Sequence, residues 1–125
     1  MAMNEPTFNA DGYPTEDTLK EIETWDYRRG FHGLMKFVQK AWNYPNYWSE
    51  EEEWYDAIKP DGSMWKRQKT LYRISTGGWS GNGMLIEAME GNWMFWNLCW
   101  VSSRRGGHYE FDVRVIETAG VNPYE

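Results

Sequence analysis

The stretch TLYRISTGGWSGNGMLIEAMEGNWMFWNLCWVSSRRGGHYEFDVRV, from Thr70 to Val115, contains most of the information about the fold. β-Branched and aromatic residues, which favour strands, are frequent in Lys69–Thr76. From Tyr109 onward, apolar and charged residues alternate as in a half-buried strand. A glycine-rich turn and an apolar helical segment lie between these two runs. The stretch therefore predicts strands near 69–76, 94–102 and 108–116 and a helix near 82–91.

A hairpin is predicted between the second and third of these strands. Two consecutive glycines, Gly106-Gly107, suit a tight two-residue turn. This turn would place Trp100 opposite Val113 and Leu98 opposite Val115, so that apolar residues face apolar residues. The second strand is apolar on both faces and is predicted to be central, with the third strand at the edge of the sheet.

Two helices are predicted ahead of this stretch. The first begins near Thr15, whose hydroxyl can cap it, and the second covers Phe31–Trp42, where apolar residues recur with helical period. Further on, Ser49-Glu50-Glu51-Glu52 matches a capping box, which predicts a short helix over 49–58. The surrounding segment, 44–65, is acidic and aromatic and is interpreted as a lid or an interface.

These elements together predict an α+β fold. A small three-stranded, mainly antiparallel sheet would pack against the two N-terminal helices and the helix near 82–91. The strand–helix–strand connection also permits a parallel pair, so the strand order stays open. We expect one domain over 15–117, a flexible arm at 1–14 and a tail at 118–125.

Composition restricts the classes of function. The chain has 125 residues and a net charge of −6, which argues against general nucleic-acid binding because that needs a basic surface. Its nine tryptophans, eight tyrosines and five phenylalanines suit a core filled with rings, a pocket lining or a contact face. Tryptophans at a subunit interface would make the protein a homo-oligomer.

The sequence also indicates the compartment and the absence of a cofactor. Cys99 is the only cysteine, so no intramolecular disulfide can form, and a reducing compartment is expected. With neither a membrane-length apolar run nor a signal-peptide pattern, we expect a cytoplasmic protein without a membrane partner. His32 and His108 are far apart in the sequence, and Glu50–Glu53 would point in different directions on a helix. No metal or other cofactor is therefore expected.

The two turns of the opening stretch are the candidate ligand-binding site. Glycines allow backbone N–H groups to approach a ligand, and a helix start favours an anion. Arginines at a rigid hairpin present planar forks that suit phosphate or carboxylate. If the turns lie at the same end of the sheet, these groups would converge around Trp79, which could stack on a base. The predicted ligand-binding residues are Thr76, Gly77, Gly78, Trp79, Ser80 and Asn82 in the first turn, and Ser102, Ser103, Arg104, Arg105, His108 and Tyr109 in the second.

Simpler interpretations of both turns stay open. The glycines can serve only a tight strand-to-helix turn, and the arginines can be solvated charges at a hairpin tip. A hydrolase using Ser80 and His108 is the least favoured interpretation, since no nucleophile-elbow pattern is present. We therefore expect a binding protein without catalytic residues.

The segments ISTGGWSGN (74–82) and MFWNLCWVSSRRGGHYEF (94–111) resemble a family of small uncharacterised proteins encoded by tailed bacteriophages. The resemblance implies an accessory protein made in an infected bacterium that counters host defence. Combined with the candidate site, it favours sequestration of an anionic, nucleotide-like ligand. The alternative is a protein–protein inhibitor that uses segment 44–65 against a host defence complex.

Overall fold

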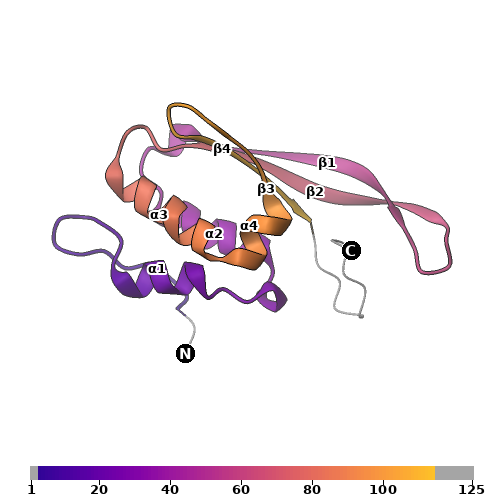
Figure 1. The fold of residues 1–125 in the computed structure, drawn as a ribbon, viewed down its shortest axis with the longest axis horizontal. Coiled ribbons are helices and arrows are strands. Elements are labelled where there is room, and N and C mark those ends of the chain that lie inside the picture. The colour runs from indigo at the N-terminus through magenta and orange to yellow at the C-terminus, as the bar shows by residue number, and fades with distance from the viewer. Residues whose placement is uncertain (1–2, 115–125) are drawn as a thin grey trace.

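The structure, a computed structural model, describes residues 3–114 and shows an α+β fold with a single sheet covered by helices on one face (Figure 1). The sheet is antiparallel, with the strand order β1-β2-β4-β3. The α+β class is confirmed, whereas the predicted three strands are four in this part of the chain. The strands are β1 (Trp48–Ile58), β2 (Met64–Ser75), β3 (Trp100–Arg104) and β4 (His108–Arg114).

The first helix begins at a residue whose side chain caps it. Thr15 accepts a hydrogen bond from the backbone of Thr18 at 3.3 Å and starts the first helix. The second helix ends before Pro45, where a short 3₁₀ turn follows. The α-helices are α1 (Glu16–Glu23), α2 (Phe31–Ala41), α3 (Ser80–Gly91) and α4 (Trp93–Cys99), and 3₁₀ turns cover Tyr27–Arg29 and Pro45–Tyr47.

The helix predicted over 49–58 is wrong, because this segment is strand β1. Each of its residues has a partner in β2, from Trp48 opposite Ile74 to Ile58 opposite Met64. A strand places consecutive glutamates on opposite faces, which separates their charges. On one of these faces, Glu51 forms an ion pair with Arg73 at 3.0 Å. Pairing with β2 along the whole length of β1 thus overrides the local capping-box pattern.

The strand predicted over 94–102 is also wrong for most of its length. Helix α4 occupies its first part, capped by Asn92, whose Oδ1 accepts a hydrogen bond from the Phe95 backbone at 3.1 Å. Phe95 and Cys99, one helical turn apart, are both buried. An apolar run of this length is compatible with a buried strand or a buried helix, and the cap decides in favour of the helix.

This helix changes the order of strands and the register of the hairpin. Strand β4 is central, between β2 and β3, and β3 is the edge strand, the reverse of the prediction. Arg104 lies opposite His108, and a bulge then brings Trp100 opposite Phe111 rather than Val113. The connecting loop therefore has three residues instead of two. Leu98 belongs to α4, and its predicted partner Val115 lies outside the described residues.

The core lies between the sheet and the helices. Strand β4 contributes Phe111 and Val113, as the alternation predicts, and β2 contributes Tyr72 and Ile74 from the neighbouring positions. The phenylalanine ring of β4 packs against Phe95 of α4, with ring centroids 5.3 Å apart. The side chains of β2 and β4 between these positions point to the other face of the sheet, which the helices leave open (Figure 1).

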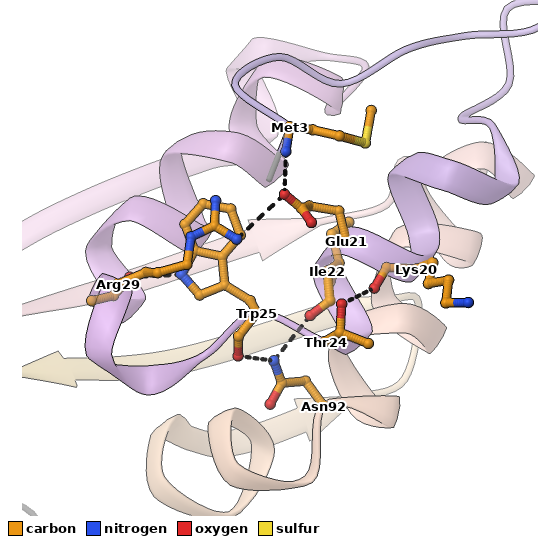
Figure 2. Close-up of polar contacts among 9 residues, drawn as sticks. Met3, Lys20, Glu21, Ile22, Thr24, Trp25, Arg29 and Asn92 are labelled. Atoms are coloured by element: carbon orange, nitrogen blue, oxygen red, sulfur yellow. Dashed lines mark hydrogen bonds and ion pairs between the residues drawn. The ribbon is translucent and has the colours of Figure 1, made fainter. Parts of the chain in front are cut away.

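Asn92 joins the N-terminal helix to this core. Its Nδ2 donates to the carbonyl oxygens of Ile22 at 2.9 Å and Trp25 at 3.0 Å (Figure 2). Arg29 lies over the ring of Trp25, 3.6 Å from its centroid, and pairs with Glu21 at 3.3 Å. The connection after α1 is thus fixed by Asn92, which precedes α4, and by the contacts of Arg29 with Trp25 and Glu21.

Candidate functional site

The two turns singled out in the sequence lie side by side at one end of the sheet. The antiparallel pairing of β2 with β4 brings Ser75 opposite His108, and the Ser75 hydroxyl lies 2.6 Å from the His108 Nδ1. Just beyond this pair, the Thr76 backbone N–H donates to the Gly107 carbonyl at 3.0 Å. The end of β2 and the hairpin loop before β4 are thus held together by backbone and side-chain hydrogen bonds.

Glycine is needed where the turns meet their neighbours. Gly107 has φ +79°, and a Cβ atom there would collide with the side chain of Thr76. Gly77 has φ +63°, and a Cβ atom there would lie 2.7 Å from the Tyr44 ring and 2.8 Å from the Tyr47 ring. At both positions the backbone is left-handed and neighbouring side chains lie close to the glycine, so a larger residue would cause both backbone strain and a steric clash.

Asn82 fixes the glycine-rich turn by hydrogen bonds to its backbone. Its side chain is fully buried in α3. Its Oδ1 accepts from the Asn43 backbone N–H at 3.0 Å, and its Nδ2 donates to the carbonyls of Asn43 at 2.9 Å and Thr76 at 3.1 Å. Each polar atom of this side chain therefore has a partner, and Asn82 joins the turn after β2 to the loop after α2.

Trp79 and Ser80 are engaged with the N-terminal segment. The rings of Trp79 and Tyr13 are stacked, with centroids 5.4 Å apart and an interplanar angle of 19°. The Ser80 hydroxyl donates to the Tyr13 hydroxyl at 3.1 Å. The Trp79 ring also lies over Gly81, where a Cβ atom would collide with it. These contacts hold Tyr13 against the start of α3.

A cleft of about 400 Å³ opens at this end of the sheet, on the face away from the helices. Its polar walls come from two cross-strand rows, one through Ser49, Arg73 and Glu110 and the other through Ser75, His108 and Arg104. The exposed ring of Tyr47 and the side chain of Asn46 complete it on the β1 side. The lining residues are Asn46, Tyr47, Ser49, Arg73, Ile74, Ser75, Arg104, His108, Tyr109 and Glu110.

The charges around the cleft are balanced by exposed ion pairs. Arg104 pairs with Glu110 at 2.6 Å, and Arg73 pairs with Glu51 at 3.0 Å. Both arginine side chains are well exposed, 70% for Arg104 and 48% for Arg73. The Arg73–Glu51 pair is exposed on both sides, and such pairs contribute only about 0–1 kcal/mol, so a bound anion can replace Glu51 at small cost.

The remaining predicted residues are distributed around this cleft. Arg104, His108 and Tyr109 line it, whereas Thr76, Gly77 and Gly78 form the adjoining turn. Ser103 accepts a hydrogen bond from the Trp100 indole at 2.8 Å, and Ser102 lies opposite Glu110 in the register. Arg105 is exposed in the hairpin loop. The structure thus brings both turns together but points Trp79, Ser80 and Asn82 to other contacts.

Sequence reasoning missed the contribution of β1 and of the middle of β2. The sequence predicts a helix over 49–58, which hides the contribution of Ser49, and assigns Tyr47 only to segment 44–65, interpreted as a lid or an interface. Arg73 could have been found, since it alternates with Tyr72 and Ile74 in the predicted strand and so had to face away from the core.

A separate polar contact lies on the helix-covered face of the sheet. The His32 Nδ1 is 3.2 Å from the Tyr72 hydroxyl, joining α2 to β2. Burial lowers the pKa of His32, and nearby Glu50 and Glu52 oppose this shift. Burial also raises the pKa of Tyr72. The histidine is therefore neutral near pH 7 and structural.

Within residues 3–114, no group of histidine, cysteine, aspartate or glutamate side chains is arranged to hold a metal ion. Over the same residues, no helix is both long enough and apolar enough to cross a membrane. No protein-family model matches the chain, and neither a curated protein nor a solved structure is similar to it.

Proposed function

We propose that this protein binds an anionic, nucleotide-like small molecule in the cleft at the turn end of the sheet. The observation that carries the proposal is the presence of two arginine forks and the Ser75–His108 pair in one concave site. Guanidinium groups bind phosphate and carboxylate through two parallel hydrogen bonds. Arg73 and Arg104, released from Glu51 and Glu110, would supply these forks.

An aromatic surface for a base is also available. Tyr47 lines the cleft and is 48% exposed, whereas the ring of Trp79 is already stacked on Tyr13. Aromatic side chains stack on any base, with a contribution of about 1–3 kcal/mol. We therefore assign the stacking role to Tyr47 instead of Trp79.

The resemblance to phage-encoded proteins gives this binding a biological purpose. A small protein that sequesters a nucleotide signal in the cytoplasm of an infected bacterium would counter a host defence that depends on the signal. Sequestration requires binding without turnover. His108 contacts Ser75 and Ser80 contacts Tyr13, which supports binding over a hydrolase that would pair Ser80 with His108.

Thermal shift with a panel of nucleotides tests the proposal. We expect at least one nucleotide to raise the melting temperature, because a ligand that binds only the folded state stabilises it. Arg104→Ala should lower the affinity for this nucleotide at least about tenfold in calorimetry, because one charge-assisted contact is lost. Arg28→Ala is the matched control, since Arg28 is an exposed arginine in the 3₁₀ turn after α1.

Two results would contradict the proposal. One is that no mononucleotide, cyclic nucleotide or dinucleotide in the panel changes the melting temperature. The other is an equal loss of affinity in Arg28→Ala and Arg104→Ala, which would indicate general charge attraction. Hydrolysis of the ligand by the wild-type protein would replace sequestration with catalysis.

A further inference from the structure

The β1–β2 hairpin extends beyond the helical layer at the end of the sheet opposite the cleft (Figure 1). Its outer half runs from the Trp54–Gln68 pair to the Ile58–Met64 pair. The tip is a well-defined turn, in which Lys59 donates to the Ser63 carbonyl at 2.8 Å. This half of the hairpin has a regular structure without support from the helices.

One face of the projecting hairpin has uncovered apolar side chains. Trp54 is 65% exposed, Ile58 70% and Met64 58%, and strand alternation places all three on the same face. The opposite face is different, because Arg67 lies 4.9 Å from the Trp65 ring centroid. On that face Arg114 similarly covers Tyr55 at 4.5 Å. Bare apolar residues are thus confined to the Trp54 face.

The outer edge of β1 is open. In the strand order β1-β2-β4-β3, β1 is a terminal strand, and no strand of residues 3–114 pairs with its outer side. Every second residue of an edge strand points its backbone N–H and C=O groups away from the sheet. An eleven-residue strand therefore provides an unusually long row of free backbone donors and acceptors.

The charges along this edge indicate what can pair with it. Glu50 and Glu52 share the face of Trp54, and neither forms an ion pair among the described residues. Glu51 and Glu53, on the other face, pair with Arg73 at 3.0 Å and Lys69 at 3.9 Å. A second copy of β1 would bring acidic residues against acidic residues, which is unfavourable for directly opposed strands.

From these observations we propose that the β1 edge binds an extended basic segment of another protein as an added strand. The segment would place lysine or arginine beside Glu50 and Glu52 and apolar residues beside Trp54 and Ile58. Main-chain hydrogen bonds would provide affinity, and the alternating side chains would select the partner. The site is distinct from the cleft, because Glu50, Glu52, Trp54 and Ile58 lie on the opposite face of β1 from Ser49, which lines the cleft.

Two synthetic peptides serve as probes, since an added strand can run in either direction. In both peptides every second residue is threonine. The residues between are lysines in the first half and valines in the second half of one peptide, and the reverse in the other. We expect one of them to bind, detected by fluorescence anisotropy and by a blue shift of Trp54 emission that Trp54→Ala removes. Peptides with glutamate in place of lysine should not bind.

Matched variants test the assignment to this edge. The Glu50→Lys/Glu52→Lys variant should lose at least about tenfold in affinity, whereas Glu87→Lys/Glu90→Lys, with the same change in net charge on α3, should change it less than about twofold. Trp54→Ala should weaken binding by a similar factor, and Trp93→Ala, which removes a tryptophan of comparable exposure (73% against 65%) from α4, should not. Melting temperatures report whether each variant is folded.

The proposal is overturned if neither peptide binds, or if both charge-reversal variants weaken binding equally. It is also overturned if sedimentation shows a dimer that Trp54→Ala dissociates, because the hairpin would then bind a second copy of the chain. Arg104→Ala should leave peptide binding unchanged. Failure of the hairpin proposal and failure of the cleft proposal are therefore observed separately.

Discussion

At the scale of single residues, two buried asparagines hold separate segments of the chain together. Asn82 joins the turn after β2 to the loop after α2, and Asn92 joins the end of α1 to the start of α4. In both cases one amide satisfies three backbone groups that would otherwise be buried without partners. An amide is the smallest side chain that donates and accepts in this way.

Asn82→Ala should lower the free energy of unfolding by about 2–4 kcal/mol, because backbone groups of Asn43 and Thr76 lose buried partners. Urea denaturation measures this change. Asn82→Asp should not rescue stability, since it removes the donors and buries a charge. Asn97→Ala is the control, as Asn97 is exposed and bonds only within its own helix. Equal stability of the Asn82→Ala and Asn97→Ala variants would refute the role of Asn82.

At the scale of elements, the success of sequence-based prediction depended on where the decisive contacts lie. Helix α3 and strand β4 were predictable because their apolar periodicity and their flanking glycines are local signals. Strand β1 was not, since the partner that stabilises it is β2, and the local pattern at Ser49 favours a helix. The cleft was half predicted for the same reason: the turns were found and the β1 wall was not.

The docking of the two turns on each other gives a prediction at this scale. Gly107→Ala introduces a methyl group against the Thr76 side chain at φ +79°, so the hairpin loop must move away from β2. We expect loss of the Ser75–His108 contact, measured as a change in the NMR chemical shifts of the His108 ring. Gly12→Ala is the control for backbone strain alone, because Gly12 has φ +85° but no neighbouring atom that an added methyl group would meet. Unchanged His108 signals in Gly107→Ala would show that the loop is not fixed by Thr76.

At the scale of the whole molecule, the sheet separates two surfaces of different chemistry. The cleft and the hairpin tip lie at opposite ends of β1, about 30 Å apart at the usual rise of a strand. The helical layer covers the turn end of the sheet on the face opposite the cleft and leaves the hairpin tip free (Figure 1). This arrangement allows ligand binding and partner binding to be altered independently by substitution.

The burial of His32, which contacts Tyr72 across the two layers, makes the stability of the molecule dependent on pH. Burial holds the pKa of His32 below its ordinary value of 6.5. Above this value the imidazole is neutral in both the folded and unfolded states and contributes nothing to the pH dependence. As the pH falls below it, the unfolded chain binds a proton that the folded protein does not, so the free energy of unfolding decreases until the folded pKa is reached.

His32→Gln replaces the titrating imidazole by an amide, which does not bind a proton in this pH range but can still hydrogen-bond to Tyr72. We expect wild-type protein to lose more stability than His32→Gln between about pH 7 and about pH 5, measured by urea denaturation at each pH. The other titrating groups are common to both proteins and cancel in the difference. Glu50→Gln/Glu52→Gln should increase the loss, because these carboxylates favour the charged imidazole. Parallel stability curves for wild type and His32→Gln would mean that His32 is protonated equally in the folded and unfolded states.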